Sequence, residues 1–436
     1  MSEKFSVLQC IRCGATYEAT EVRYRCDCGD LLEVAHDLER LRFAFPDMRK
    51  RFAARAGSTQ FPYASGVWRF HEMILPDLPM ADIVSKPEGN TNLYRTAKLS
   101  RAFQTDRLYL KHEGENPTLS FKDRGMTTGV SWAKHLGMKI VACASTGDTS
   151  AAMAAYAAQV DDLRGVVFLP HNKISPEQLA QAIAYGAVTL ALDTDFDGCM
   201  RLVQQVAERY PIYLLNSMNS LRIEGQKSIG LESIAQLGWR VPDWFVIPVG
   251  NAGNISALGK GLREAYALGV IDRLPRIAAI QAQAADPFFR SYQTGFTERI
   301  FVTAEPTLAS AIRIGAPVSH DKAAKVVAEF DGVVEEVTEA ELMDAKALAD
   351  RCGVAVCPNS GVALAGLRKL RAQKIIEDEQ TVVAIMTAHG LKFSQVGVDY
   401  HTGAMSALPP HHVNAPLVLP ADMAAIVDAL QLENGR

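Results

Sequence analysis

A lysine at the junction of a polar loop and a predicted helix is the first residue in this sequence whose type and setting suit chemistry. Lys122 lies in the segment ENPTLSFKDRGM, from Glu115 to Met126, which opens with turn residues. Burial and the positive end of a helix dipole disfavour a charged ammonium, so the pKa of such a lysine falls and its amine can form a Schiff base. The alternative, more common for a lysine taken alone, is pairing with a neighbouring carboxylate on a solvated helix face.

A second loop is rich in hydroxyl groups. The segment ASTGDTS, from Ala144 to Ser150, follows the apolar run Ile140–Cys143 and opens an alanine-rich helix. Backbone N–H groups at the start of a helix, beside several hydroxyls, form an anion site of a size suited to a carboxylate. Taken by itself, the segment is equally compatible with an ordinary helix N-cap.

A third loop is rich in glycine. The segment PVGNAGNIS, from Pro248 to Ser256, follows a predicted strand and enters a predicted helix. Gly250 and Gly253 would let the backbone approach a phosphate closely, and the exposed amides would receive it. No Lys-Ser or Lys-Thr pair follows the second glycine, and no GxGxxG fingerprint with a downstream acid occurs, so neither a Walker loop nor a dinucleotide site is supported.

Four of the eight cysteines lie close together near the N-terminus. Cys10 and Cys13 form one pair and Cys26 and Cys28 form another, a pattern that resembles a zinc ribbon whose four thiolates complete a tetrahedral site. The second pair has one intervening residue where two are usual, so a knuckle without metal is the alternative. Any metal here should be structural, because the loops described above lie far along the chain. The remaining cysteines are expected to be reduced core residues: Cys143, Cys199, Cys352 and Cys357.

The composition is that of a globular protein with ample material for a large core. Of its 436 residues, 48% are apolar and 22% are charged, and the formal net charge of −4 gives no strong attraction to nucleic acids or anionic membranes. No segment approaches eighteen uninterrupted apolar residues, and residues 1–25 hold no apolar run of signal-peptide length. The sequence therefore predicts a cytoplasmic protein without a membrane span.

From about Ile83 onward, short β-branched runs alternate with helical patterns, which predicts a parallel α/β architecture. The predicted strands are Arg107–Lys111, Lys139–Ala144, Gly165–Leu169, Val188–Leu192, Ile212–Leu215, Trp244–Val249, Arg276–Gln281 and Val382–Met386. The predicted helices include Ser150–Gln159, Pro176–Tyr185 and Cys199–Tyr210. Ligands bind at the carboxyl ends of strands in open α/β sheets, so the loops that follow these strands are where a ligand is expected.

Taken together, the three loops resemble those of fold-type II pyridoxal 5'-phosphate (PLP) enzymes, the group that contains tryptophan synthase β, cysteine synthase and serine/threonine dehydratases. The order also matches: Schiff-base lysine, carboxylate loop, then glycine-rich phosphate loop. Within that group the sequence is most similar to the threonine synthases, and some members of that family also have an N-terminal cysteine module. The similar segments are NPTLSFKDRGM from Asn116, NSMNSLRIEGQK from Asn216, TLASAIRIG from Thr307, LAGL from Leu364 and TAHGLK from Thr387.

The resemblance implies the fold and the domains. It predicts two open, mostly parallel sheets with flanking helices, as in tryptophan synthase β, and a small N-terminal cysteine-knuckle module. Residues 1–35 would form the zinc-ribbon-like module. Residues 36–436 would form the PLP-dependent catalytic region, which would embed a smaller α/β domain at about 125–220. A homodimer is expected.

The resemblance also implies a role for each site residue. Lys122 would be the catalytic residue and would hold PLP, and Thr387 would face the pyridine nitrogen. The other implied PLP-binding residues are Asp148, Gly250, Asn251, Ala252, Gly253 and Asn254. The implied substrate-binding residues are Ser145, Thr146, Thr149, Asn216, Ser217 and Arg222. The implied reaction converts O-phospho-L-homoserine and water to threonine and phosphate by γ-elimination and β-addition.

The sequence departs from the family pattern at several positions. Leu119 stands where glycine is commoner, Asn92 stands where proline usually follows the Glu-Gly-Asn-Thr run, and Cys357 precedes Pro358 where glutamate is common. Asp148 stands where asparagine often contacts the phenolic oxygen of PLP. An ionised carboxylate would repel that oxygen, so the expected arrangement is a proton shared between the two groups. The alternative is that Asp148 turns away and caps a helix beginning near Thr149.

Alternative functions depend on Arg222 and its segment. A planar guanidinium can hold two oxygens of a substrate phosphate, whereas the alternative for Arg222 is a surface charge paired with Glu224. A phosphate site would also serve a β-replacement enzyme acting on O-phosphoserine, similar to cysteate synthase. A PLP-binding relic without catalysis would have no need of Arg222, and a simple dehydratase would leave the segment from Asn216 to Lys227 without a role.

Overall fold

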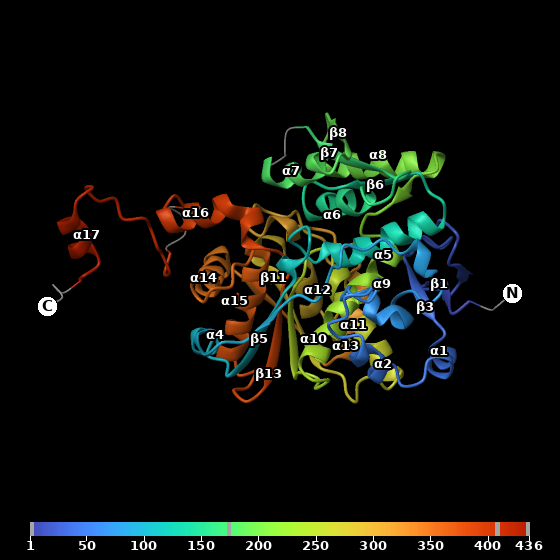
Figure 1. Ribbon diagram of the computed structural model, residues 1–436, viewed down its shortest axis with the longest axis horizontal. Helices are drawn as coiled ribbons and strands as arrows, with labels where there is room; N and C mark the ends of the chain where they lie inside the picture. The colour runs from blue at the N-terminus through green and yellow to red at the C-terminus, as the bar shows by residue number, and fades with distance from the viewer. Residues whose placement is uncertain (1–3, 172–175, 406–409, 433–436) are drawn as a thin grey trace.

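Two parallel β-sheets form the body of the chain, and the smaller sheet lies above the larger one in the view of Figure 1. The computed structural model describes residues 4–171, 176–405 and 410–432. The larger sheet has the strand order β12-β11-β10-β13-β5-β4 and is parallel except for the antiparallel pair β4–β5. Its strands are β4 (Leu93–Tyr94), β5 (Arg107–His112), β10 (Trp244–Pro248), β11 (Arg276–Ala282), β12 (Val333–Val337) and β13 (Thr381–Met386).

The smaller sheet is entirely parallel and has the order β8-β7-β6-β9. Its strands are β6 (Ile140–Ala144), β7 (Arg164–Pro170), β8 (Val188–Leu192) and β9 (Tyr213–Leu214). The helices that follow its strands are α6 (Asp148–Ala157), α7 (Pro176–Ala184) and α8 (Phe196–Arg209). The predicted fold class is therefore confirmed, and each of the eight predicted strands is present with both ends within one residue of the expected position.

The third sheet is small and antiparallel and has the order β2-β1-β3. It consists of β1 (Ser6–Cys10), β2 (Thr16–Glu18) and β3 (Leu32–His36), and it lies at the right of Figure 1, beside the helices of the larger sheet. β3 packs against α9 (Ser220–Gln226). The four-cysteine module is thus part of the described body. The boundaries predicted at residue 35 and at about 125–220 stay predictions.

The remaining helices cover the larger sheet, fill the space between the sheets or extend from the body. They are α1 (Leu38–Ala44), α2 (Met48–Ala54), α3 (His71–Ile74), α4 (Ala97–Ala102), α5 (Lys122–His135), α10 (Ser228–Gln236), α11 (Gly253–Ala267), α12 (Pro287–Gln293), α13 (His320–Glu329), α14 (Glu339–Arg351), α15 (Pro358–Ala372), α16 (Ser394–Thr402) and α17 (Met423–Ala429). α17 stands away from the body at the left of Figure 1. Within the described ranges, no helix has the length and apolar character needed to cross a membrane.

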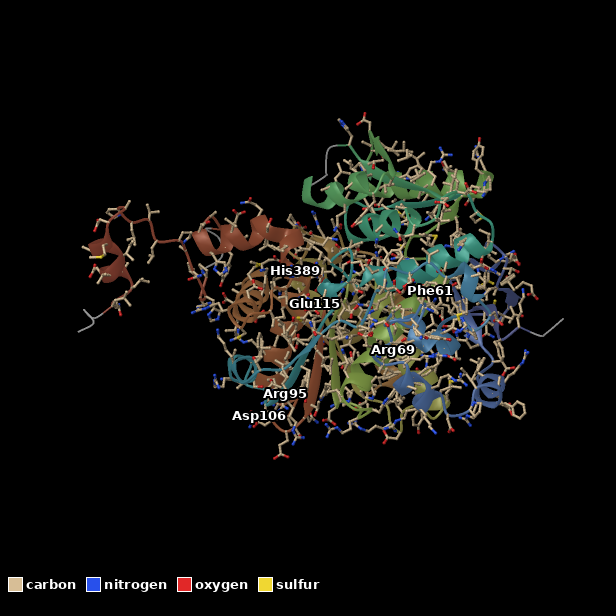
Figure 2. All side chains as sticks on the ribbon, in the orientation of Figure 1. Phe61, Arg69, Arg95, Asp106, Glu115 and His389 are labelled. Atoms are coloured by element: carbon tan, nitrogen blue, oxygen red, sulfur yellow. The ribbon has the colours of Figure 1, made fainter. Side chains whose placement is uncertain are left out.

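The two ends of the larger sheet are easily told apart in Figure 2. Asp106, which precedes β5, lies at one end of the sheet, and Glu115, which follows β5, lies at the other end. His389, from the loop that follows β13, lies beside Glu115. The loops at the carboxyl ends of β5 and β13 therefore meet at one edge, as the parallel architecture requires.

α5 is buried between the sheets, and a network of buried charges fixes its first turn. Every residue from Asp123 to Ala133 is buried. The Arg124 guanidinium donates to Glu113 at 2.6 and 2.7 Å and to Glu232 at 2.9 and 3.2 Å. Lys111 of β5 donates to Glu232 at 2.5 Å, and all four of these side chains are fully buried. The network joins β5, α5 and α10.

We expect Arg124→Met to lower the free energy of unfolding by about 3–5 kcal/mol, because Glu113 would keep a buried carboxylate without its cation. The measurement is the midpoint of urea unfolding, followed by circular dichroism. Lys139→Met is the matched control, since Lys139 is 68% exposed and lies 3.3 Å from Asp162, which is 80% exposed. The control should unfold like the wild type. Equal midpoints for the two variants would contradict a stabilising role for the network.

Candidate active site

The Lys122 loop is held by the loop that follows β13. Phe121 N–H donates to the Thr387 carbonyl at 3.0 Å, and His389 N–H donates to the Leu119 carbonyl at 3.1 Å. Leu119 has a φ of 64°, in the left-handed region that glycine adopts without penalty. This conformation explains why glycine is the commoner residue at this position, and it costs a leucine about 1–2 kcal/mol.

The Lys122 amine lies in surroundings that favour its neutral form. Burial lowers the pKa of Lys122, the nearby Arg222 guanidinium lowers it as well, and Asp148 partly offsets both effects, so that the pKa lies at about 7. The lysine is the first residue of α5, and its Nζ lies 4.4 Å from the centre of the Phe121 ring. The alternative of a lysine ion-paired on a solvated helix face is therefore wrong.

The glycine loop has the features of a phosphate cradle. A Cβ at Gly250 would lie 2.8 Å from the Ile312 Cα, so only glycine fits there. Ala252 has a φ of 62° and is the N-cap of α11, whose first turn has no side-chain cap. The oxygen and nitrogen of the Asn254 side chain are buried, and neither has a partner among the described residues. Uncapped amides and an unpartnered buried amide side chain fit the oxygens of a phosphate group.

The hydroxyl loop leads into α6 with free N–H groups. The N-cap of α6 is Gly147, which has no side-chain cap, and the helix begins at Asp148. The proposed capping of this helix by Asp148 is therefore wrong.

The Asp148 carboxylate instead lies 2.6 Å from the Lys392 ammonium. Lys392 belongs to η6 (Gly390–Phe393) and was not among the residues predicted for the site. A lysine in a loop gives no sequence signal for a partner so distant along the chain.

The hydroxyl groups expected to bind a carboxylate lie at this helix start. Ser145 Oγ accepts from the Gly147 N–H at 3.2 Å. The Thr146 and Thr149 side chains are partly exposed and have no hydrogen bond within the described chain. They remain free to contact a ligand.

Arg222 is a buried cation without a carboxylate partner among the described residues. It is 3% exposed, Nη1 donates to the Leu215 carbonyl at 2.9 Å, and Nε has no partner. Burial lowers the pKa of Arg222 to about 10. Pairing with Glu224 is wrong, because Glu224 lies 2.6 Å from Lys260 and 2.9 Å from His36. The guanidinium is thus available for an anion.

Asn216 and Ser217, which precede Arg222 in the chain, differ in how many hydrogen-bond partners their side chains already have. The Asn216 side chain holds the backbone of Ala144 through two hydrogen bonds, at 3.0 and 2.9 Å. One N–H of this amide remains for a ligand, so the structure gives Asn216 a bracing role that the sequence did not suggest. Ser217 is partly exposed, and its hydroxyl has no hydrogen-bond partner within the described chain.

Thr387 is buried beside Cys357. Its Oγ1 lies 3.7 Å from the Cys357 Sγ, and its N–H donates to Ser360 Oγ at 2.9 Å. Cys357 is the N-cap of α15 and accepts from the Ser360 N–H. Because cysteine stands here in place of glutamate, the groups around Thr387 are a thiol and hydroxyls. Cys143 and Cys199 are also buried and Cys352 is partly buried, and all are free thiols, as predicted for core cysteines.

The four N-terminal cysteines form a compact cluster. Their four Sγ atoms all lie within 4.8 Å of one another. The Sγ atoms of Cys10 and Cys28 are 3.5 Å apart, and those of Cys13 and Cys26 are 3.4 Å apart. Sulfurs at about 2.3 Å from a tetrahedral zinc ion lie about 3.8 Å from one another. The single residue between Cys26 and Cys28 therefore does not prevent the four thiolates from surrounding a zinc ion.

We expect Lys122 to titrate with a midpoint near pH 7, because burial and Arg222 stabilise its neutral form. Below that pH the amine is protonated and unreactive, and its reactivity rises as the pH passes through 7. The measurement is acetylation of the cofactor-free protein by acetic anhydride between pH 5 and 10, with Lys122 quantified by peptide mass spectrometry. The exposed Lys139 serves as an internal control for the reagent. A midpoint above pH 9 would contradict the buried setting.

We expect the purified protein to contain about one zinc ion per chain, held by the cysteine cluster. The measurement is elemental analysis of the wild type and of Cys10→Ser, which should lose the metal. Cys352→Ser, outside the cluster, should retain it. Wild-type protein free of zinc would favour the knuckle without metal.

Comparison with known proteins supports a single family. A family model described as "Pyridoxal-phosphate dependent enzyme" matches residues 84–388. Threonine synthase 2, chloroplastic, of Arabidopsis thaliana is 45% identical over 424 residues, which cover 95% of this chain and 82% of that protein. The threonine synthase of Methanocaldococcus jannaschii is 43% identical over 387 residues, which cover 88% of this chain and 92% of that protein.

Solved structures have the same fold. The crystal structure of threonine synthase from Escherichia coli matches with a TM-score of 0.66 and 20% identity, over 98% of this chain and 99% of that one. Threonine deaminase isoform 2 of Solanum lycopersicum, in its processed form, matches with a TM-score of 0.62 and 20% identity, over 73% of this chain and 88% of that one. These likenesses concern the fold, whereas the sequence identities above concern the family. The chain belongs to the threonine synthases, a family of PLP-dependent enzymes of fold type II.

Proposed function

We propose that the chain converts O-phospho-L-homoserine and water to L-threonine and inorganic phosphate, with PLP held on Lys122. Threonine synthases that are 39–45% identical to it, several of them over most of their length, support this reaction. The individual roles of the site residues, given below, are part of the proposal.

The glycine loop and Thr387 would hold the cofactor. The amides of Gly253 and Asn254, at the uncapped start of α11, would receive its phosphate, and Asn251 and Ala252 would shape the loop. When bound, PLP delocalises the negative charge that develops at the substrate Cα. The neutral Thr387 hydroxyl would leave the pyridine nitrogen largely unprotonated, which favours elimination and replacement over transamination.

Lys122 would move the proton at the substrate Cα. A pKa of about 7 lets its amine exist in both protonation states near neutral pH, so it can accept a proton from Cα and later return one. A second proton leaves Cβ, and phosphate departs from Cγ with the electron pair of its C–O bond. Cγ gains a proton, the oxygen of water adds at Cβ, and Lys122 returns a proton to Cα.

Arg222 is the residue that most strongly supports a phosphorylated substrate. Its buried guanidinium has a donor, Nε, that no described residue satisfies, and a buried cation without a counter-ion is costly. A phosphate dianion would supply both the charge and the acceptor oxygens, with Ser217 and the remaining N–H of Asn216 as further donors. The α-carboxylate would lie at the start of α6, against Ser145, Thr146 and Thr149.

The oligomeric state, the cellular location and the domain boundaries do not depend on the contacts of the site. The sequence predicts a homodimer and a cytoplasmic location, and both stay predictions. The embedded domain at about 125–220 also stays a prediction, although the strands β6 to β9 all fall within it.

We expect Arg222→Lys to lower kcat/KM for phosphohomoserine by about thirty-fold to a thousand-fold, a loss of about 2–4 kcal/mol, because lysine cannot present a planar pair of donors. PLP absorbance should be unchanged. Arg201→Lys, on the exposed face of α8, is the matched control and should behave as the wild type. An equal loss of PLP and activity would make Arg222 structural.

The substrate is tested by phosphate release from O-phosphohomoserine and from O-phosphoserine, measured in parallel on the wild type. We expect release with phosphohomoserine and threonine as the second product. Faster release from phosphoserine would replace the proposed reaction with a β-replacement.

A further inference from the structure

We propose that Lys392 is a positioning residue, which by pairing with Asp148 holds the hydroxyl loop of the smaller sheet against the Lys122 loop and keeps one carboxylate beside the Lys122 amine. The inference rests on the proposed function, in which Lys122 is the reacting lysine, and it assigns Lys392 a role in that site.

The contacts of Lys392 join three separate parts of the chain. Its Nζ lies 2.6 Å from Asp148 Oδ1 at the start of α6, and it donates to the Thr118 carbonyl at 3.1 Å. Lys392 itself belongs to η6, which follows β13 of the larger sheet. A single ammonium thus links the smaller sheet, the larger sheet and the Lys122 loop.

Both charges of this pair are removed from solvent. The Lys392 side chain is 5% exposed and the Asp148 side chain is 9% exposed. Removing one partner of such a pair leaves a buried charge that water cannot solvate, so each side chain keeps the other in place. The pair therefore fixes the distance between η6 and the start of α6, where the substrate carboxylate is proposed to bind.

Other charged groups near Lys122 do not replace this pair. Arg222 on α9 and Asp148 on α6 are the charges that act on the amine, in opposite directions. Asp123, the next residue of α5, accepts from Thr118 Oγ1 at 2.6 Å. Burial raises the pKa of Asp123 to about 7, so it is not a constant counter-ion for Lys392. Asp148 is thus the carboxylate that Lys392 holds.

The pair also reduces the repulsion expected between the Asp148 carboxylate and the phenolic oxygen of PLP. The ammonium of Lys392 balances the charge of the carboxylate, so a shared proton is not required for the two oxygens to lie together. The same balance limits how strongly Asp148 can raise the pKa of Lys122.

Opposite effects on Lys122 follow from removing each partner. Asp148→Asn removes the carboxylate and leaves Lys392 and Arg222 as cations, so the pKa of Lys122 should fall. Lys392→Met removes a cation and releases the carboxylate toward the amine, so the pKa of Lys122 should rise. In the double variant the two changes oppose each other, and the pKa should lie between those of the single variants.

The experiment is the acetylation titration of Lys122 in cofactor-free protein, carried out on the wild type, both single variants and the double variant. We expect the midpoint to move by about one pH unit in each direction, the lower end of the effect of a charge within 4–6 Å. Lys392→Arg keeps the cation and should restore the wild-type midpoint. Lys134→Met, at a partly exposed position on α5, and Asp162→Asn, at an exposed position, are the controls and should leave it unchanged.

Midpoints that coincide, or that move in the same direction in both single variants, would overturn the inference. If Lys392→Met does not fold, the direction of the shift in Asp148→Asn and the recovery in Lys392→Arg still decide it. Borohydride fixation of PLP in the wild type distinguishes failure of the proposed function from failure of this inference. A label on a lysine other than Lys122 overturns the proposed function, whereas the titration shifts test the Lys392–Asp148 pair itself.

Discussion

The burial of Arg124 between Glu113 and Glu232 is the constraint on which the rest of the site depends. A guanidinium without solvent must have its carboxylates in place, and these come from η3 (Glu113–Glu115) and α10. Arg124 lies two residues beyond Lys122 on α5, so the network fixes the helix end that carries the Lys122 amine. The strain at Leu119 is tolerated because the neighbouring backbone is held on both sides, by this network and by the loop after β13.

The electrostatics of the site follow from an excess of buried cations. Arg222 and Asp148 both act on the Lys122 amine, and Lys392 pairs with Asp148, so these cations outnumber the carboxylate and favour a ligand with several negative charges. A second buried network lies behind Arg222, where Glu224 binds His36 of β3 and Lys260 of α11. Glu224 is therefore neutralised by these partners, and the N-terminal module supports the helix that carries Arg222.

The sequence was sufficient for most of the fold and for the loops, because parallel buried strands are continuous apolar runs and strand-end loops have a distinctive composition. β12 was missed because its sequence, VVEEV, interrupts the apolar pattern with Glu335 and Glu336. The partners of Asp148, Asn216 and Glu224 could not be predicted. Each side chain pairs with groups from distant segments of the chain, and local periodicity contains no information about such pairs. The start of α6 at Asp148 lies two residues before the predicted start at Ser150.

The strand order has a consequence for the way the chain folds during synthesis. All strands of the smaller sheet lie between residues 140 and 214, so this sheet can form as soon as that segment leaves the ribosome. The larger sheet cannot close then, because β5 pairs with β13, whose last residue is Met386. The backbone bonds that hold the Lys122 loop come from the segment just after β13. The Lys122 loop is therefore fixed in place only when nearly the whole chain has been translated.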